Sequence, residues 1–328
     1  MTDEVLSVWG VSDGRAGIER QVLSLIYALT EIAPDTHASV KRLAPRGLQA
    51  HLPADLQPLP KLALPRAQRA ELAEPWPDIW IACGRRSLPY SLSVKRWSKG
   101  KTFVVQCQDP RLNPARFDMV IPPAHDDLRG ETVFPILGAP VHFPAEALEQ
   151  ARSKFGYLGE EQGFRCMVVL GGDSKAYKLT PHRAAEIEAQ LEMLAKRDVK
   201  LWLTASRRTP EAARIRFRAF ATRHGFPWWS PDEDAPNPYL GFLQYADAAI
   251  ITADSTNMIG DAAWFGLPIH LMALDGGSEK FTALHKGFEA AGAARWFLGR
   301  VDRWAYPPVR EAERAARELL DRYRAARG

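Results

Sequence analysis

Short apolar runs alternate with segments of helical spacing along almost the whole 328-residue chain. The intervening segments, such as 184–196 and 211–224, repeat apolar side chains at the period of an α-helix. Strands that are apolar throughout and joined by helices are typical of a parallel sheet covered on both faces. The runs form two groups, which predicts an α/β fold with two such sheets: 5–10, 37–42, 79–83, 103–107, 118–121 and 132–136, then 165–170, 200–204, 226–229, 248–252 and 268–272.

The length also indicates two domains, because one hydrophobic core rarely serves more than about 250–300 residues. The turn-rich stretch GAPVHFP at 138–144 and the polar loop that follows the next helical segment mark the boundary. We therefore assign residues 1–150 to an N-terminal domain and 151–328 to a C-terminal domain. The terminal segment 309–328 is predicted to form a charged amphipathic helix that lies across one domain.

The composition is that of a globular protein, with 46% hydrophobic and 25% charged residues. The formal net charge of +4 is too small to indicate a nucleic-acid partner. Three cysteines beside apolar runs are predicted to be reduced core residues, and they lack the spacing of metal ligands. The N-terminus has no pattern of a signal peptide, and no stretch approaches about 18 apolar residues, so the sequence predicts a cytoplasmic protein.

Polar loops follow the first and third apolar runs, where ligands of parallel sheets bind. Glycines after the first run permit close backbone approach, and a helix start offers N–H groups to an anion, although an ordinary turn would look similar. Adjacent arginines after the third run suit a phosphate or carboxylate. The residues are Asp13, Gly14, Arg15 and Gly17, then Arg85 and Arg86. The stretch 85–101 is basic with apolar residues between, so it is either a membrane-facing or anionic-acceptor surface or a solvated helix edge.

Two further loops of the first half carry polar groups. Gln108, Asp109 and Arg111 share a proline-stiffened turn after the fourth run. After the fifth run, His125 stands next to Asp126, a pattern that fits a general base with an orienting carboxylate as well as a surface turn.

The second half repeats this plan with clearer anion-binding features. A glycine turn with basic side chains suits a diphosphate, because it offers aimed N–H donors and compensating charge. Each of two successive loops ends in a Thr-Pro pair that suits the start of a helix. The candidates are Gly171, Gly172, Asp173, Ser174 and Lys175 before Thr180-Pro181, and Arg207 and Arg208 before Thr209-Pro210.

A third polar cluster lies in the stretch IITADSTNMIGDAAWFGLP from 250 to 268. Asp254 or Ser255 is predicted to cap the next helix, and Thr256 and Asn257 add further polar groups suited to phosphate oxygens around its N-terminus. Asp261, about two turns along, is placed to reach a sugar hydroxyl. A cap with a solvated first turn is the alternative.

The ordered motifs DGRAGIERQ, PDIWIACGRRS, QDPR, PPAHD, LGGDSKAY, TASRRTP, NPYLGFLQYAD and TADSTNM resemble the elongated-mitochondria family of mitochondrial fission proteins, which has bacterial members. The second half is also similar to the nucleotide-sugar domain of two-domain glycosyltransferases of the B architecture (GT-B). The resemblance implies two Rossmann-like domains facing a cleft, with the C-terminal helix crossing back to the N-terminal domain.

The resemblance further implies a nucleoside-diphosphate sugar as donor and no bound metal or other cofactor. Gly171, Gly172, Ser174, Ser255 and Thr256 would then hold diphosphate with help from Arg207 and Arg208. Tyr239, Leu240 and Leu243 would line the base, and Asp261 stands where a ribose-binding glutamate is usual.

We therefore expect a glycosyltransferase that acts on an envelope lipid or polysaccharide acceptor, with Asp13 or His125 as base and with contact at the inner face of the membrane. The alternative is a non-catalytic protein of the same fold that acts as a binding or scaffold protein at membranes. A nicotinamide-dependent oxidoreductase is disfavoured by the missing GxGxxG motif.

Overall fold

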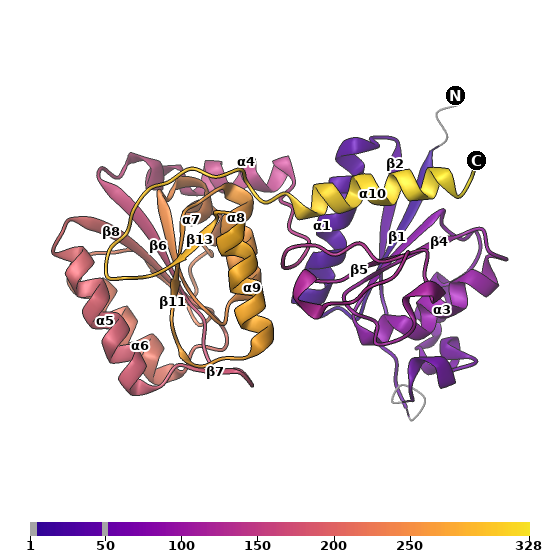
Figure 1. Ribbon diagram of the computed structural model, residues 1–328, viewed down its shortest axis with the longest axis horizontal. Helices are drawn as coiled ribbons and strands as arrows, with labels where there is room; N and C mark the ends of the chain where they lie inside the picture. The colour runs from indigo at the N-terminus through magenta and orange to yellow at the C-terminus, as the bar shows by residue number, and fades with distance from the viewer. Residues whose placement is uncertain (1–4, 48–51) are drawn as a thin grey trace. The chain divides into compact units, whose positions relative to one another are not determined.

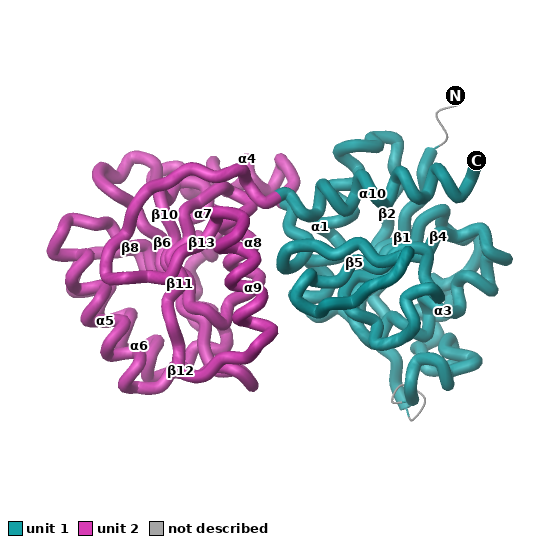
Figure 2. Tube along the Cα trace, viewed as in Figure 1, with its two compact units in different colours: residues 1–142, 310–328 teal, residues 143–309 magenta. Residues whose placement is uncertain are grey.

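A computed structural model of the chain describes residues 5–47 and 52–328. It divides into two compact units, residues 1–142 with 310–328 and residues 143–309 (Figure 2). The boundary thus lies earlier than the predicted 150/151. The terminal helix belongs to the first unit, as the resemblance implied with a helix that crosses back, although the predicted range 151–328 had counted it with the second domain. The early boundary has a packing reason, because the helix at 145–155 buries Phe155 against Gly241, where an added Cβ would lie 2.7 Å from the Cβ of Phe155.

The first unit contains a five-stranded parallel sheet in the order β2-β1-β3-β4-β5 (Figure 1). Its central strands β3 and β4 are buried at every residue, which explains why they read as continuous apolar runs. The strands are β1 (Leu6–Ser12), β2 (Thr36–Arg42), β3 (Ile79–Cys83), β4 (Phe103–Cys107) and β5 (Met119–Ile121).

Helices cover both faces of this sheet. On one face α1 (Ala16–Ile32) packs beside the terminal helix α10 (Glu311–Ala325), and on the other lies α3 (Leu88–Trp97) (Figure 1). The apolar stripe of α10 is fully or almost fully buried at helical spacing, namely Ala312, Ala315, Ala316, Leu319 and Leu320. The other helical segments that the structure describes in this unit are short: η2 (Ala54–Leu56), η3 (Pro60–Ala63), α2 (Arg66–Glu71), η4 (Arg85–Ser87), η5 (Pro114–Arg116) and η6 (Ala124–Asp126).

The second unit contains a six-stranded parallel sheet in the order β13-β11-β10-β6-β8-β9. Counted within the unit, this is the order 6-5-4-1-2-3, which is the Rossmann arrangement with its switch point between β6 and β10. The strands are β6 (Phe164–Leu170), β8 (Val199–Ala205), β9 (Trp228–Trp229), β10 (Ala248–Thr252), β11 (Ile269–Met272) and β13 (Ala294–Trp296).

Six α-helices, one 3-10 helix and a small antiparallel ribbon complete this unit. The ribbon joins β7 (Tyr177–Lys178) to β12 (Asp275–Gly276). The helical elements are α4 (Ala145–Phe155), η7 (Gly156–Glu160), α5 (Pro181–Ala195), α6 (Glu211–His224), α7 (Tyr239–Tyr245), α8 (Thr256–Phe265) and α9 (Glu279–Ala290).

The predicted α/β fold with two parallel sheets is confirmed, with local differences. The predicted strand at 132–136 forms only two isolated bridges to the sheet, through Val133 and Ile136. Pro135 between them has no N–H to donate, so a regular strand is interrupted there. The three cysteines are buried and free, as expected. Within the described ranges, no helix is long and apolar enough to cross a membrane.

Candidate functional site

Three loops of the second unit meet at the carboxyl edge of its sheet. They follow β6, β8 and β10, which are neighbouring strands. Backbone hydrogen bonds join the first two loops, because Ser206 donates to the carbonyl of Leu170 at 2.9 Å and Asp173 donates to the carbonyl of Arg208 at 3.0 Å. The sequence-predicted groups at 171–175, 206–208 and 254–257 are therefore brought together at the switch point of the sheet.

A buried carboxylate holds the centre of this edge. The side chain of Asp254 is fully buried and accepts hydrogen bonds from the N–H of Gly172 at 3.0 Å and from the hydroxyl of Thr252 at 2.8 Å. The guanidinium of Arg208 completes the set at 2.7 Å. Because a buried charge is expensive unless it is paired and hydrogen-bonded, these partners are what allows Asp254 to occupy this position.

The two glycines after β6 make room for the chain itself. A Cβ at Gly171 would lie 2.1 Å from a carboxylate oxygen of Asp254, and one at Gly172 would lie 2.0 Å from the carbonyl oxygen of Arg208. Their N–H groups donate to Thr252, at 2.7 Å, and to Asp254. Internal side chains thus accept both hydrogens in this arrangement, so the role of these two amides in binding a diphosphate stays a prediction.

The threonines of the two Thr-Pro pairs have different roles. Thr180 caps α5 as predicted, since its hydroxyl accepts from the N–H of Arg183. Thr209 does not cap α6, because its hydroxyl lies 2.8 Å from the carbonyl oxygen of Leu170 and 2.5 Å from that of Gly171. Thr209 thus fastens the loop after β8 to the loop after β6.

Polar groups at the rim of this edge remain open to a ligand. Lys175 and Arg207 are exposed, and neither forms an ion pair with any described residue. The N-cap Ser255 forms no side-chain cap, so the first amides of α8, at Thr256 and Asn257, have no partner within the helix. Ser174 is already used, because its hydroxyl accepts from two amides of its own turn. The rim therefore offers an anion two cations and a helix N-terminus.

The predicted base and ribose contacts lie on α7 and α8. The hydroxyl of Tyr239 donates to the carboxylate of Asp261 at 2.9 Å, and Asp261 is fully buried. Leu240 is half-buried and Leu243 is buried. In this arrangement a ribose could reach Asp261 only if Tyr239 moved, so the ribose contact stays a prediction.

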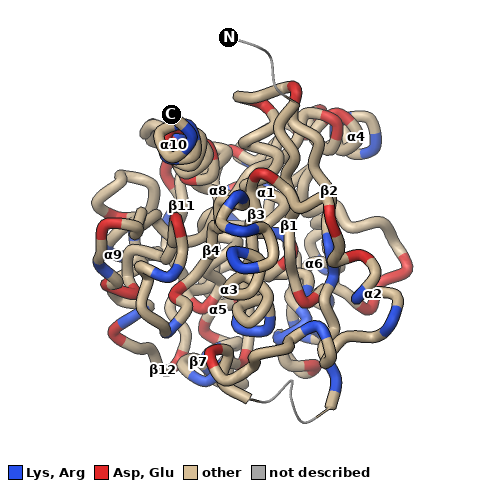
Figure 3. The backbone as a smooth tube through the Cα atoms, turned by 90° about the vertical axis from the view of Figure 1, so that its right-hand side faces the viewer, with Lys and Arg blue, Asp and Glu red and all other residues tan. Residues whose placement is uncertain are grey.

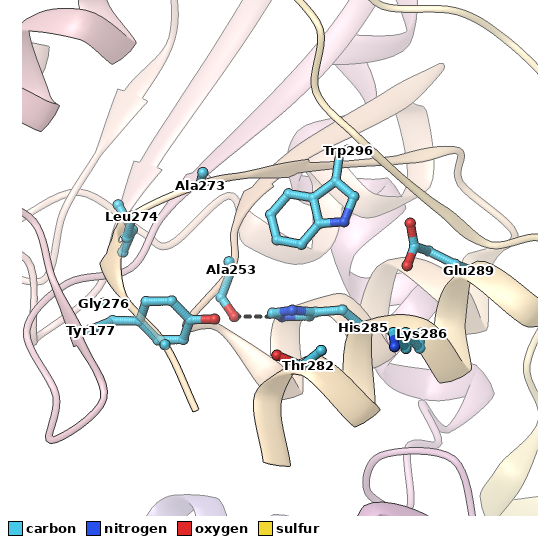
Figure 4. Close-up of a pocket in the computed structure, with 11 residues that line it drawn as sticks. Tyr177, Ala253, Ala273, Leu274, Gly276, Thr282, His285, Lys286, Glu289 and Trp296 are labelled. Atoms are coloured by element: carbon cyan, nitrogen blue, oxygen red, sulfur yellow. Dashed lines mark hydrogen bonds between the residues drawn. The ribbon is translucent and has the colours of Figure 1, made fainter. Parts of the chain in front are cut away.

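A pocket of about 260 Å³ opens beyond the ends of β10 and β11 (Figure 4). Tyr177 lies on one side, and Trp296 and His285 lie on the other, with their rings 5.4 Å apart and nearly perpendicular. His285 is bound to the carbonyl oxygen of Ala253 through Nε2 at 2.8 Å. Gly276, Gly277, Thr282, Lys286 and Glu289 also line the pocket. Aromatic faces with a few polar groups are typical of small-molecule sites.

Burial changes the titration of the aromatic groups in this pocket. Desolvation lowers the pKa of His285 below its ordinary value near 6.5, because burial penalises the imidazolium ion. Desolvation also raises the pKa of the Tyr177 phenol, with a further contribution from the charge of Asp254. Both side chains are therefore held neutral at neutral pH and can act as hydrogen-bonding groups.

Sequence reasoning missed this pocket. Its residues on β12, α9 and β13 belong to no recognised motif. Tyr177 and Ala253 lie in the motifs LGGDSKAY and TADSTNM, but neither was singled out as a site residue. The signal available in the sequence was the Gly276-Gly277 pair after the apolar run of β11. In the structure both glycines have positive φ angles.

In the first unit, the loop after β1 is folded onto itself. The side chain of Asp13 is only 1% exposed and binds Arg15, through the guanidinium at 2.8 Å and the amide at 3.2 Å. Gly14 has a φ of 78°, which favours glycine, and Gly17 is the second residue of α1. Asp13 therefore orients Arg15 in this arrangement, and its predicted role as a base stays a prediction.

A network beside this loop ties β1 to β2. Glu19 accepts a bidentate pair of hydrogen bonds from Arg42, at 2.7 and 2.8 Å, and a third from the hydroxyl of Ser12. The hydrogen bonding of Arg42 lowers the pKa of Glu19 below its usual value, against the effect of burial.

Five predicted acceptor-side or catalytic residues line one pocket of about 270 Å³ at the ends of β3, β4 and β5, namely Arg85, Gln108, Asp109, Arg111 and Asp126. A neighbouring pocket of about 500 Å³ shares Arg85 and Arg111 and adds Arg86. The structure thus brings together most of the predicted residues of this half. His125 lies on η6 beside Asp126 but lines neither pocket.

Metal ligands do not gather at either sheet edge. Over residues 5–47 and 52–328, no group of three or more His, Cys, Asp or Glu side chains is arranged to hold a metal ion.

Comparison with solved structures gives the fold. The structure superposes on a protein from Listeria monocytogenes named as a putative UDP-N-acetylglucosamine 2-epimerase, with a TM-score of 0.57 at 15% identity, covering 96% of this chain and 88% of that one. A UDP-glucose complex of Medicago truncatula UGT71G1 gives a TM-score of 0.51 at 10% identity, covering 99% and 95%. At such identities the likeness establishes the fold alone, which is the GT-B-like pair of Rossmann-like units.

Relatives in sequence give the family. The chain is 28% identical over 313 residues to the mitochondrial fission protein ELM1 of Arabidopsis thaliana, covering 86% of this chain and 71% of that protein. It is 24% identical over 359 residues to the uncharacterized protein RP120 of Rickettsia prowazekii (strain Madrid E), covering 95% and 97%. The model of the family described as Mitochondrial fission ELM1 matches residues 16–323, so the chain belongs to the mitochondrial fission ELM1 family.

Proposed function

We propose that the second unit binds a nucleoside-diphosphate sugar and that the chain transfers the sugar to an envelope lipid or polysaccharide acceptor without a metal. The observation that carries the proposal is the place of the 260 Å³ pocket, which lies at the carboxyl ends of β10 and β11 in a Rossmann sheet. Ala253 lines this pocket and immediately precedes the loop that starts α8.

The donor would divide between two neighbouring places. The sugar would lie in the pocket, where Trp296 and Tyr177 offer ring faces and His285, Thr282 and Lys286 offer polar groups. The diphosphate would lie at the rim, where Lys175 and Arg207 compensate its charge and the first amides of α8 donate to its oxygens. These same groups would stabilise the departing diphosphate.

The acceptor would bind to the first unit. Arg85 and Arg111 line its 270 Å³ pocket and suit an anionic group on the acceptor. Of the two candidate bases, His125 is half-buried, whereas the carboxylate of Asp13 is enclosed by Arg15. Exposure therefore favours His125 as the group that takes the proton from the acceptor hydroxyl.

One observation favours a second candidate function, a non-catalytic binding or scaffold protein acting at membranes. In the glycine turn after β6, the N–H of Gly172 donates to Asp254, which is also paired with Arg208. The carboxylate of Asp261 accepts a hydrogen bond from the hydroxyl of Tyr239. A diphosphate site whose glycine amides are already satisfied has lost part of the donor set that catalysis would use.

Thermal unfolding of the full chain with a panel of nucleoside diphosphates and their sugars tests donor binding. A ligand that binds only the folded state raises the midpoint, by about 2.7 kcal/mol of stabilisation at a concentration 100 times its dissociation constant. We expect the shift to shrink in K175A/R207A and to persist in K196A, which removes an exposed cation next to β8 at the opposite edge of the same sheet. No shift with any ligand would contradict both donor binding and transfer.

Release of nucleoside diphosphate from the bound donor separates the two candidates. Slow release in water that is accelerated by a phosphorylated lipid or polysaccharide acceptor supports the transferase. Binding without release under all acceptor conditions supports the binding protein.

A further inference from the structure

An exposed leucine-rich segment lies beside exposed arginines in the first unit. Ten large apolar side chains are exposed among the described residues, and four of them are leucines within residues 52–62. Leu52, Leu56, Leu59 and Leu62 are between 46% and 62% exposed. A concentration of exposed apolar groups in one short segment indicates a contact surface rather than chance.

The segment is anchored, so its leucines are held outward. The hydroxyl of Tyr90 on α3 donates to the carbonyl of Pro60 at 3.2 Å. The ammonium of Lys61 lies over the rings of Trp76 and Trp97, at 4.7 and 4.3 Å from their centroids. These contacts fix η3 against the unit, and Gln57 holds the start of the segment through the carbonyl of Leu52 at 2.7 Å.

Three arginines stand next to this segment. Arg85, Arg86 and Arg111 line the 500 Å³ pocket together with Leu52 and residues 53–55. Arg85 and Arg86 form no ion pair with any residue that the structure describes, and Arg111 is 63% exposed with its Nε 3.9 Å from Asp109. Asp55 also lines the pocket, but the stretch 85–111 as a whole carries seven basic residues and one acidic residue.

We propose that these leucines and arginines form one face, the leucine–arginine face (Leu52, Leu56, Leu59, Leu62, Arg85, Arg86 and Arg111), which docks the protein on an anionic phospholipid membrane. The guanidinium groups would bind lipid phosphates, for which their planar fork is suited. The leucines would enter the interface between headgroups and acyl chains. A bilayer with anionic lipid is the partner that satisfies both chemistries at adjacent positions.

The face differs from the membrane-facing surface that the sequence suggested at 85–101. Of the apolar residues of that stretch, Leu88, Tyr90 and Val94 are buried in the core, and Leu92 and Trp97 are partly buried against it. Lys95 is paired with Asp118 at 2.7 Å. Basic positions do surround α3 in Figure 3, and the apolar part of the proposed contact comes from η2 and η3 instead.

Vesicle sedimentation without any nucleotide tests the proposal independently of donor binding. The full chain should pellet with vesicles of phosphatidylcholine plus phosphatidylglycerol and not with phosphatidylcholine alone. In R85Q/R86Q the binding constant should fall about 25-fold, since each basic residue at an anionic surface contributes about fivefold, the equivalent of ~1 kcal/mol. The variant R317Q/R324Q removes two exposed charges from α10 and should bind as the unmodified chain does.

The leucines need their own variant because charge alone attracts any basic protein to such vesicles. L56S/L59S should weaken binding severalfold, whereas I215S, which removes an equally exposed apolar side chain from α6 of the second unit, should not. Thermal midpoints close to that of the unmodified chain would show that the variants fold.

Three outcomes would overturn the proposal. The first is equal pelleting with both vesicle types, and the second is unchanged binding in L56S/L59S. The third is a thermal shift with inorganic phosphate that R85Q/R86Q abolishes while vesicle binding persists, because the arginines would then serve a free anion. Loss of nucleotide binding with vesicle binding retained would affect only the proposed function.

Discussion

The guanidinium of Arg208 lies 2.7 Å from the carboxylate of Asp254, and the two residues belong to loops that are 46 positions apart in the chain. Asp254 is fully buried, whereas the side chain of Arg208 is 44% exposed. The pair therefore joins the interior of the switch point to its rim. Because Asp254 also accepts the N–H of Gly172, that amide of the glycine turn is not free to bind a ligand in this arrangement.

The variant D254A should destabilise the second unit by about 2–4 kcal/mol, because it leaves Arg208 and the amide of Gly172 without their acceptor. Urea unfolding followed by far-UV circular dichroism measures this. E149A breaks an exposed ion pair to Arg152 on α4 and should cost less than about 0.5 kcal/mol. Equal losses in the two variants would contradict the central role of Asp254.

The variant G172A should cost at least ~3 kcal/mol, since the added methyl group would lie 2.0 Å from the backbone oxygen of Arg208, which cannot rotate away. G156A is the matched control, because Gly156 has a helical φ of −56° and only the hydroxyl of Tyr245 nearby, at 3.9 Å. It should be neutral or stabilising by up to about 1 kcal/mol. Thermal midpoints of the two variants compare them directly, and a tolerated G172A would be incompatible with the close approach.

The pKa of His285 predicts a dependence of stability on pH. Burial lowers this pKa in the folded state, so the unfolded state takes up a proton first as the pH falls below the ordinary value near 6.5. The contribution to stability is present above that pH and is lost as the pH falls. H285Q, whose amide can still donate to Ala253, should therefore lose less unfolding free energy than the unmodified chain between about pH 7.5 and 5.5. Urea titrations of both proteins at the two pH values measure this. An equal loss of unfolding free energy in H285Q and in the unmodified chain would contradict the prediction.

The variant Y239F removes the hydroxyl that donates to the buried carboxylate of Asp261. Leaving a buried acceptor without this donor should cost about 1–3 kcal/mol of unfolding free energy. Y157F removes a hydroxyl from a tyrosine that is 60% exposed and should have no measurable effect. Differential scanning calorimetry compares the stabilities of the two variants. An unchanged stability of Y239F would show that the hydrogen bond between Tyr239 and Asp261 contributes little.

The variant L319A should destabilise the first unit by about 2–5 kcal/mol, because Leu319 on α10 is fully buried in the core that α10 forms with α1. R317A changes an exposed position of the same helix and should leave the unfolding free energy unchanged. Hydrogen exchange read peptide by peptide should show faster opening in residues 5–32 and no change in residues 164–205. Uniform acceleration across both units would refute the assignment of α10 to the first unit alone.

The strands were predictable because burial on both faces leaves a direct trace in the sequence. β3 reads IWIAC and is buried at every position. β13 was missed because only the first of its three residues is buried, so it has no apolar run. The segment 132–136 misled in the opposite way, since it is apolar but Pro135 interrupts its pairing.

The sheet edge that carries the candidate site was predictable, and the hydrogen bonds within the site were not. Parallel topology alone brings the loops after β6, β8 and β10 to one edge, so the polar stretches could be grouped from sequence. Whether Gly172 faces a ligand or Asp254 depends on the register between strands about 80 residues apart. No local pattern carries that information, and the same holds for the meeting of Tyr177, His285 and Trp296.

Because α10 supplies one wall of the first unit, that unit is made of two separate stretches of chain, whereas residues 143–309 are continuous. During synthesis the second unit can complete its core as soon as its own residues have left the ribosome. The first unit, although its sheet is made earlier, keeps the α1 side of that sheet only partly covered, by α1 alone, until residues 311–325 emerge. Nascent chains of this protein thus carry an open apolar surface through most of translation, and a chaperone that binds such surfaces would find it there.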